Sequence, residues 1–189
     1  MTVEVDPSRV ERRLAAGEIC CPGCAQALSP WGWARWRVLR GFGGAVLRLR
    51  PRRAVCPRCR ATHVLLPVVA LSRRADLAEV IGAALAAKAI GEGLRPIAAA
   101  LGRHADTVRG WLRRFTARAV LLRTLFTVLL VDTGPDPRVP AESGSPLADA
   151  VAAILGAWAA MVSRWPVLGK VPPWQIACAV TAGRLLAPR

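Results

Sequence analysis

The chain has 189 residues and a formal net charge of +15, with 27 Lys or Arg residues against 12 Asp or Glu residues. This length suits one ordinary domain or two small ones. The first twenty residues contain no apolar run. The longest apolar stretches, Leu125–Val131 and Ala150–Val162, are shorter than the ~20 residues of a membrane-spanning helix, so composition argues against a secretory signal and a membrane span.

The positive charge is concentrated in the front part of the chain. Residues 1–75 carry 14 Arg against 4 acidic residues, whereas residues 131–189 carry 5 basic and 4 acidic residues. The only lysines are Lys88 and Lys170. Arginine binds phosphate oxygens in a better fork than lysine does, although GC-rich codons favour arginine as well. This basic field indicates a polyanionic partner, with nucleic acid preferred to an anionic membrane.

Two C-x-x-C pairs follow a short helical lead-in, residues 1–19. Cys21–Cys24 and Cys56–Cys59 are separated by 31 residues. Four cysteines in this pattern are typical of a closed tetrahedral zinc site, which stabilises a fold and leaves no position open for chemistry. The sequence therefore predicts a zinc ribbon over residues 20–67. A structural Zn(2+) ion would be bound there by Cys21, Cys24, Cys56 and Cys59.

Two other cysteines and one histidine could have different roles in or outside the metal site. Cys20 could replace Cys21 as a ligand, although the C-P-G-C spacing favours Cys21. His63 is a substitute ligand, a strand histidine near the ribbon surface, or a phosphate contact. Cys178 lies in an Ala/Val-rich helix and is most simply a small core residue. Reduced thiols on a metal fit a cytoplasmic protein.

Two strand-like runs, residues 35–40 and 45–50, lie inside the ribbon and are joined by the glycine-rich residues 41–44, which is typical of a hairpin. A third strand is expected over residues 62–66. The second run alternates, so Arg48 and Arg50 share one face. Together with the arginines just before the second cysteine pair they make a set of guanidinium groups suited to phosphates. The expected DNA-backbone contacts in the ribbon are Arg48, Arg50, Arg52 and Arg53.

Three tryptophans, Trp31, Trp33 and Trp36, precede and begin the first run. They could stack on unpaired bases, as aromatic residues do in single-strand binders. A small ribbon has little core, however, and tryptophans that cover the zinc layer are the interpretation we favour from the sequence.

The helical region begins at Asp76, which is expected to cap a helix from Leu77 to about Gly91. A short helix, residues 95–101, leads into the turn Gly102-Arg103-His104-Ala105, and a further helix starts near Asp106. This pattern is typical of a helix-turn-helix. Apolar residues then recur at alternating steps of four and three up to Leu129, which predicts one long helix to Leu130. The expected domain spans residues 76–130 and includes this extended recognition helix.

The remainder of the chain shows no candidate chemistry. Residues 131–146 are rich in Pro and Gly and are expected to form a linker. Residues 147–189 are expected to form a C-terminal helical tail, with helices near residues 146–163 and 173–186. The second half of the extended helix would pack on these helices, or it would form the seam of a homodimer; the tail is a second route to a homodimer.

The polar groups of the second helix of the motif suit DNA. Trp111 belongs to the inward stripe and is expected in the core. Because the first turn of a recognition helix meets base edges, the expected readout residues are His104, Asp106, Thr107 and Arg109, with Arg109 placed for a bidentate contact to guanine. Further backbone contacts are expected from Arg103, Arg113 and Arg114. The plainer interpretation is a solvated charged face.

The ribbon and the helix-turn-helix together resemble the N-terminal DNA-binding head of bacterial insertion-sequence transposases, and short helix-turn-helix proteins of similar length. The resemblance covers about residues 20–116. It implies that the two modules act together on double-stranded DNA, as such heads do at terminal inverted repeats. The segments that carry it are Cys21–Cys24, Gly32, Arg35, Arg37, Leu39-Arg40, Leu47–Arg53, Cys56–Cys59, Arg95–Ala98 and Thr107–Phe115.

The sequence differs from the pattern of this family in two important ways. Glycine usually follows each cysteine knuckle, and here Ala25 and Arg60 stand at those places. The catalytic half of a transposase needs three carboxylates on an RNase H-like fold to hold two metal ions. Residues 129–132 imitate the first strand of such a fold, but too few residues and acids follow for the rest. We therefore expect no enzymatic activity.

The sequence leads to one overall expectation. The fold class is α+β: a small β zinc ribbon followed by an all-α helix-turn-helix region and C-terminal helices. The expected function is sequence-specific binding of double-stranded DNA by a cytoplasmic protein. Two alternatives stay open, an RNA or single-stranded nucleic-acid binder and a protein-interaction adaptor.

Overall fold

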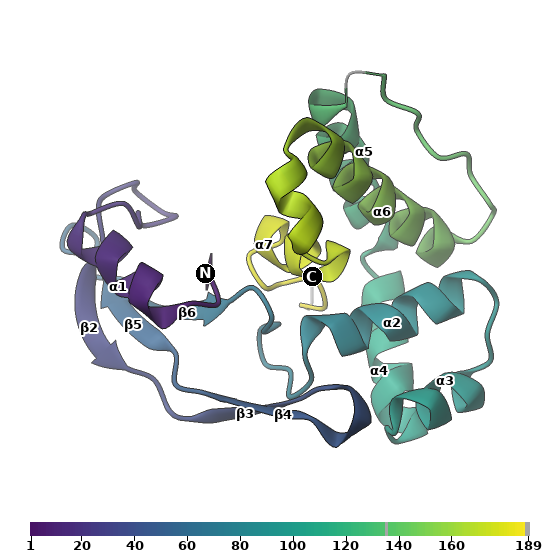
Figure 1. The fold of residues 1–189 in the computed structure, drawn as a ribbon, viewed down its shortest axis with the longest axis horizontal. Helices are drawn as coiled ribbons and strands as arrows, with labels where there is room; N and C mark the ends of the chain where they lie inside the picture. Colours follow the sequence, from purple (N-terminus) through teal and green to yellow (C-terminus); the bar gives the residue numbers. More distant parts are fainter. Residues whose placement is uncertain (135, 188–189) are drawn as a thin grey trace.

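A small β region forms the first third of the chain and helices form the rest (Figure 1). The computed structural model describes residues 1–134 and 136–187. The β region holds a four-stranded mixed sheet in the order β1-β6-β5-β2, in which only the β1–β6 pair is parallel. Its strands are β1 (Thr2–Val3), β2 (Ser29–Trp33), β5 (Arg52–Val55) and β6 (Thr62–Pro67). The predicted α+β class is confirmed.

The hairpin predicted from the glycine-rich turn forms a separate two-stranded sheet. Strands β3 (Arg37–Arg40) and β4 (Val46–Leu49) pair antiparallel, and a 3-10 turn, η1 (Phe42–Gly44), joins them. Gly43 and Gly44 both take positive φ there, at 55° and 80°, which is why this turn requires glycine. Figure 1 shows the hairpin running from the four-stranded sheet to the base of the helical region.

Helix α1 (Pro7–Ala15) completes the β region. Asp6 caps it, since the Asp6 carboxylate accepts a 2.9 Å hydrogen bond from the backbone N–H of Ser8. Val10 and Leu14 face the sheet and join a small core with Ile19, Leu28 and Leu65. Two of the cysteines, Cys21 and Cys56, belong to the same buried cluster.

Three helices lie in the region where the sequence predicts a helix-turn-helix: α2 (Ala78–Ala89), α3 (Leu94–Leu101) and α4 (Ala105–Thr116). Gly102 ends α3 in the left-handed region, with φ of 61°, and so turns the chain toward α4. The apolar stripe of α4 faces inward as predicted: Val108, Trp111 and Phe115 are all buried.

The predicted single helix from Asp106 to Leu130 is wrong. The chain forms two helices here, because α4 ends at Thr116 and α5 (Ala119–Thr133) begins after a two-residue break. At the break the N–H of Arg118 donates to the carbonyl of Phe115, and Arg118 has φ of −115°. The change of direction lets α5 pack against α6, so the apolar stripe continues across two helices that share one core.

Helix α6 (Pro146–Arg164), the 3-10 turn η2 (Pro166–Lys170) and helix α7 (Pro173–Val180) form the C-terminal part. The expected last helix therefore ends at Val180 rather than Leu186, and turns follow it. By length and composition alone, α6 is the one helix in the described part of the chain that could cross a membrane. Core helices of soluble proteins pass the same test, and here α6 packs against α5, α2 and α7.

Candidate metal centre and nucleic-acid interface

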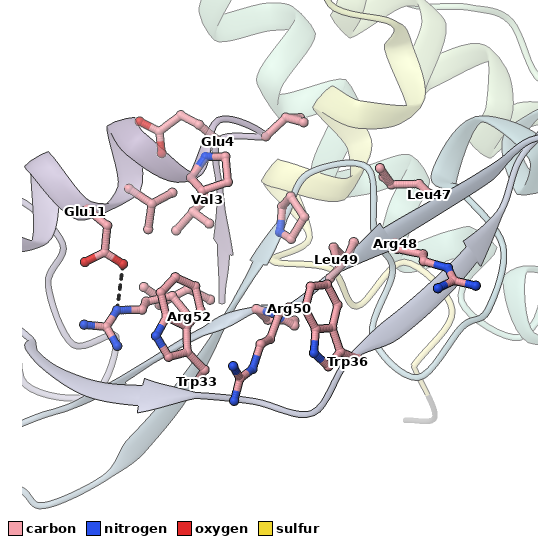
Figure 2. Close-up of a pocket in the computed structure, with 16 residues that line it drawn as sticks. Val3, Glu4, Glu11, Trp33, Trp36, Leu47, Arg48, Leu49, Arg50 and Arg52 are labelled. Carbon is pink, nitrogen blue, oxygen red and sulfur yellow. Dashed lines mark ion pairs between the residues drawn. The ribbon is translucent and has the colours of Figure 1, made fainter.

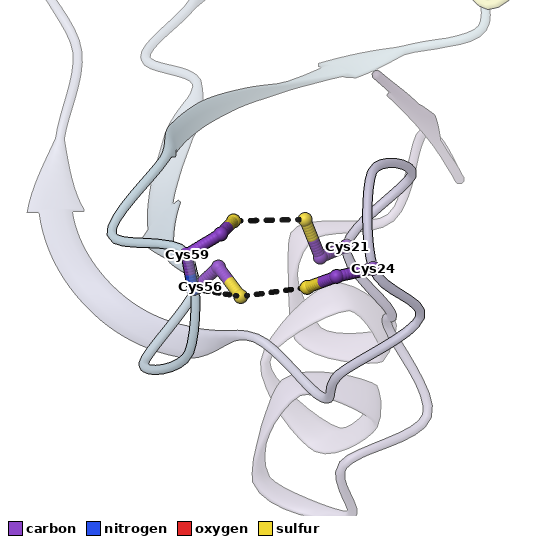
Figure 3. A group of neighbouring side chains, drawn as sticks. All are labelled: Cys21, Cys24, Cys56 and Cys59. Atoms are coloured by element: carbon purple, nitrogen blue, oxygen red, sulfur yellow. Dashed lines mark hydrogen bonds between the residues drawn. The ribbon is translucent and has the colours of Figure 1, made fainter.

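The four predicted cysteine ligands meet at one place (Figure 3). The sulfur atoms of Cys21, Cys24, Cys56 and Cys59 all lie within 4.8 Å of one another. The Cys21–Cys59 pair is 3.7 Å apart and the Cys24–Cys56 pair 3.4 Å apart. A tetrahedral ion with metal–sulfur bonds of about 2.3 Å separates its sulfurs by about 3.8 Å. The four thiols therefore lie where one tetrahedral ion would hold them, and they could bind a metal.

The two cysteine knuckles have matching backbone geometry. The N–H of Ala25 donates to the carbonyl of Cys21, and the N–H of Arg60 donates to the carbonyl of Cys56, both at 2.9 Å. Ala25 and Arg60 take φ of 57° and 61°, so both hold the left-handed backbone conformation that glycine adopts more readily. The N–H of Cys59 also lies 3.5 Å from the Cys56 sulfur, which suits a thiolate acceptor.

The pKa values of Cys24 and Cys56 are shifted in opposite directions. The pKa of Cys56 is lowered to about 7, first by the hydrogen bond from the N–H of Cys59 and then by the neighbouring thiols. The pKa of Cys24 is raised to about 11: the N–H of Gln26 lowers it, but hydrogen bonds with the other thiols and desolvation outweigh that effect. A divalent cation at the centre would favour the thiolate form of all four.

The two alternative ligands of the ribbon lie outside this group. Cys20 is exposed and pairs through its backbone with Ala27 on the opposite side of the knuckle. His63 lies beside the group, with its Nε2 atom 3.5 Å from the Cys21 sulfur. Among the described residues, the cluster that could hold a metal is the predicted four-cysteine set. The raised pKa of Cys178, about 12, results from its burial and agrees with a core position.

A buried ion-pair junction connects the hairpin to the helix-turn-helix. Asp76 does not cap α2, whose first flanking residue is Leu77; instead its carboxylate is 3% exposed and accepts from two arginines. Arg103 Nε lies 2.6 Å from one oxygen and Arg40 Nη2 lies 2.9 Å from the other. Arg103 also donates to the carbonyl of Gly41 at the tip of the hairpin, at 2.7 Å.

Backbone hydrogen bonds reinforce this junction. The N–H of Arg40 donates to the carbonyl of Ala75, and the N–H of Leu77 donates to the carbonyl of Arg40. Strand β3 is therefore joined to the segment that begins α2. Sequence reasoning missed the junction, because Asp before a helix is most often a cap; the arginine-rich strand offered no signal of which guanidinium would pair with it.

Arg103 was predicted to contact DNA phosphates, and the structure corrects this. Its side chain is 8% exposed and donates hydrogen bonds to the Asp76 carboxylate and the Gly41 carbonyl. Arg52 is similar: its side chain is 15% exposed, pairs with Glu11 at 2.7 Å and donates to the carbonyl of Gly32 at 2.6 Å. Both guanidinium groups stabilise the fold and are not free for phosphates.

The other arginines predicted to contact the DNA backbone differ in their exposure and in their hydrogen bonds. Arg48 and Arg50 on the hairpin and Arg113 on α4 are exposed. Arg53 is half-buried, and Arg114 donates to the carbonyl of Gly110 one turn earlier in its own helix. Arg48, Arg50 and Arg113 are thus the guanidinium groups best placed to meet a polyanion.

The predicted readout residues form one surface at the start of α4. His104 caps the helix, and the side chains of His104 and Asp106 are 77% and 66% exposed. Thr107 is half-buried. Arg109 is exposed and forms an ion pair with Asp106 three residues earlier. The four residues lie together at the N-terminal end of the second helix of the motif, in the position that meets base edges in helix-turn-helix proteins.

The tryptophans do not cover the metal centre, so the interpretation favoured from sequence is wrong. Trp31, Trp33 and Trp36 are 52%, 44% and 67% exposed. The buried layer beside the cysteines is supplied by α1 and the sheet instead, through Val10, Leu14 and other aliphatic residues. Trp33 and Trp36 line a cavity of about 460 Å³ between α1 and the start of the hairpin (Figure 2).

Compared with known proteins, the chain matches no family model, no curated protein and no solved structure at a significant level.

Proposed function

We propose that the chain is a sequence-specific double-stranded DNA-binding protein. In this proposal α4 enters the major groove and reads bases through His104, Asp106, Thr107 and Arg109. The observation that carries it is the exposed polar surface at the start of α4, on a helix-turn-helix unit that the Asp76 junction holds against an arginine-bearing hairpin. The transposase-like origin suggested by the resemblance is part of the same proposal.

The hairpin arginines would supply sequence-independent affinity. Arg48 and Arg50 are exposed, and the hairpin tip is bonded to Arg103 in the turn that precedes α4. Phosphate contacts of this kind release counterions, so they give affinity that falls steeply with salt. The ribbon would thus hold the duplex while α4 selects its sequence.

The metal in this proposal is a structural Zn²⁺ ion. Four thiolates around a tetrahedral centre favour zinc over the harder cations, which prefer oxygen ligands. All four positions would be filled by protein sulfurs, which leaves no open coordination position for a substrate. The proposal therefore assigns no reaction to the chain. Asp132, which ends the segment that resembles a catalytic strand in sequence, lies in helix α5.

A second copy of the chain is the partner we propose for α5. Helix α5 exposes Leu121, Leu125 and Val128, at 58%, 39% and 53%. Their four-then-three spacing is the heptad step that lets a helix pack against a copy of itself. Leu121→Glu with Leu125→Glu is expected to convert a dimer to a monomer in light scattering, and a wild-type monomer at ~100 μM would contradict the idea.

Selection from random duplex DNA tests the main proposal. The zinc-loaded protein would be used at ~150 mM salt, where non-specific binding is weak. We expect one recovered motif. Arg109→Ala should lose discrimination at one base position, by about 1–3 kcal/mol. Arg113→Ala should weaken binding to all sequences and reduce its salt dependence.

Arg138→Ala is the matched control, because that arginine is 92% exposed on the loop before α6 and lies outside the proposed interface. It removes the same charge and should leave both the motif and the affinity unchanged. Recovery of no motif, with binding that vanishes as salt rises, would reduce the claim to non-specific attraction between a basic protein and a polyanion.

A further inference from the structure

The cavity beside the hairpin combines aromatic surface with positive charge. It is about 460 Å³ in volume and lies between α1, the edge of the sheet and the base of the β3–β4 hairpin. Trp33 and Trp36 form part of its wall, with Arg48 and Arg50 beside them (Figure 2). The remaining lining is largely apolar, which favours a flat, poorly hydrated ligand group over an ion alone.

Trp33 is held in place by the protein before any ligand arrives. The guanidinium carbon of Arg52 lies 4.9 Å from the centre of the Trp33 ring, in a cation–π contact. Arg52 is itself fixed by Glu11 and by the carbonyl of Gly32. Trp33 nevertheless remains 44% exposed. A fixed aromatic surface that remains open loses little conformational entropy when it binds a flat ligand.

Trp36 and Arg50 extend this surface toward the hairpin. Trp36 is 67% exposed, more than the other two ribbon tryptophans. In Figure 2 the Arg50 side chain lies between Trp33 and Trp36 and points out of the cavity. Among the residues that the structure describes, Arg50 makes one long hydrogen bond, 3.4 Å from its Nε atom to the carbonyl of Ala34, so its Nη atoms are available to a phosphate.

The acidic residues of the cavity do not cancel this charge. Glu4 pairs with Arg13 at 2.8 Å, and Glu11 pairs with Arg52 at 2.7 Å. Both carboxylates are therefore neutralised within the fold. Arg48 and Arg50, which pair with no acidic residue among the described residues, leave the edge of the cavity positive.

We propose that this Trp–Arg cavity binds unpaired nucleotides of a single-stranded nucleic acid. Bases would stack on Trp33 and Trp36, and the adjoining phosphates would contact Arg48 and Arg50. Bases within a duplex are stacked on each other and cannot offer their faces, so this site differs in ligand from the readout surface of α4. It does not depend on the proposed reading of duplex DNA, and either activity can fail without the other.

The test measures binding of the zinc-loaded full chain to fluorescently labelled twelve-nucleotide oligo-dT and oligo-rU. These oligonucleotides have little structure of their own. We expect Trp33→Ala and Trp36→Ala to weaken binding roughly 5- to 150-fold each, the range for loss of one stacked base. Trp33→Phe should recover much of the loss. Preference for dT or for rU would identify DNA or RNA as the source of the strand.

Trp31→Ala is the matched control. Trp31 lies on the same strand and is 52% exposed, but it does not line the cavity, so its loss should leave the affinity unchanged. Metal content and circular dichroism would verify that each variant is folded. The proposal is overturned if the wild type binds neither oligonucleotide at 50 mM salt, or if Trp31→Ala weakens binding as much as Trp33→Ala does. Duplex selection with the same variants would separately show whether α4 still reads its motif.

Discussion

The β region and the helical region bury their cores in different ways. The helical core is continuous from α2 to α7 and is built from large side chains such as Phe115, Phe126 and Leu85, all fully buried. The β region has a much smaller core in which two of the four clustered cysteines, Cys21 and Cys56, are themselves buried members. Side-chain packing alone can hold the first, whereas the second needs a cross-link because a small domain buries too little apolar surface.

The difference also separates the proposed tasks. The helical region presents one polar surface on a helix that its own core fixes, which suits recognition of a defined sequence. The β region presents open tryptophans and arginines on a sheet and hairpin that a metal ion bound by the four cysteines would hold together. Breaking either core should therefore affect one task before the other.

Removal of the metal should have the largest effect. Structural zinc sites contribute about 10–16 kcal/mol of apparent binding free energy in small zinc-finger peptides, so the ribbon should unfold when a chelator removes the ion. Hydrogen exchange followed by mass spectrometry should show residues 20–67 losing protection while residues 78–187 keep theirs. Cys21→Ser should reproduce the effect. Cys20→Ser, at the exposed neighbouring thiol, should not.

Protection of the ribbon amides that survives complete removal of metal would contradict this contrast. It would mean that α1 and the sheet hold the β region without a cross-link. Acidification offers a second route to the same state, because protons compete with the metal for the thiolates, and the ribbon should therefore release its ion as the pH falls.

Loss of the Asp76 carboxylate should have the next largest effect, because it removes the junction between the two regions. Asp76→Ala would leave Arg103, which is 8% exposed, as a buried charge without its partner. Breaking a buried pair in this way costs about 3–5 kcal/mol. Urea denaturation of the metal-loaded protein should show this loss of stability, and the affinity for DNA should fall because the hairpin and α4 would no longer be held together.

Asp106→Ala is the control for this variant. Asp106 also pairs with an arginine, but its side chain is 66% exposed, and exposed pairs contribute under about 1 kcal/mol. Equal loss of stability from both substitutions would show that burial of Asp76 has no energetic importance.

Within the helical region, Gly82→Ala tests how tightly the large core is packed. A Cβ atom at Gly82 would lie 2.0–2.2 Å from three atoms of the Trp174 ring, so α2 and α7 would have to separate. Overpacking of this kind costs about 1–3 kcal/mol. Gly110→Ala is the matched substitution, since the nearest atom is the flexible end of Arg114 and the gain in helix propensity should dominate. Thermal denaturation should show opposite signs for the two variants.

The sequence predicted the parts of the molecule that depend on local pattern. Cysteine spacing located all four members of the cluster that could bind a metal, since a knuckle is a short local turn. A glycine marked the turn at Gly102, and the spacing of apolar residues identified the inward face of α4. The surface of readout residues at the start of α4 follows from the same spacing, because helical geometry fixes which residues share a face.

The parts that were missed depend on contacts between distant segments. The break after Thr116 has no glycine or proline at it and results from packing of α5 on α6. Strand β2 contains Pro30 and Gly32, which argue against a strand, and it forms because β5 offers it a partner. The pairing of Asp76 with Arg103 joins residues 27 positions apart, and no local pattern selects one arginine among so many.

The smallest expected effect concerns the two knuckles. Ala25 and Arg60 both hold positive φ, near 60°, where an L residue is less stable than glycine by roughly 1–2 kcal/mol. Part of that gain is offset by the greater backbone freedom of glycine in the unfolded chain. Ala25→Gly should therefore stabilise the metal-loaded ribbon by about 1 kcal/mol. Greater resistance of the ribbon to a competing chelator is the measurement, and Arg60→Gly should act in the same direction.

Ala27→Gly distinguishes this explanation from a general effect of loop glycines. Ala27 follows the same knuckle but is not among the residues with positive φ, so glycine there brings only the entropic penalty and should weaken the ribbon by roughly 0.5–1 kcal/mol. Opposite signs for Ala25→Gly and Ala27→Gly would locate the strain in the left-handed residue of the knuckle. Destabilisation by both would mean that the hydrogen bond from residue 25 to the Cys21 carbonyl already relieves that strain.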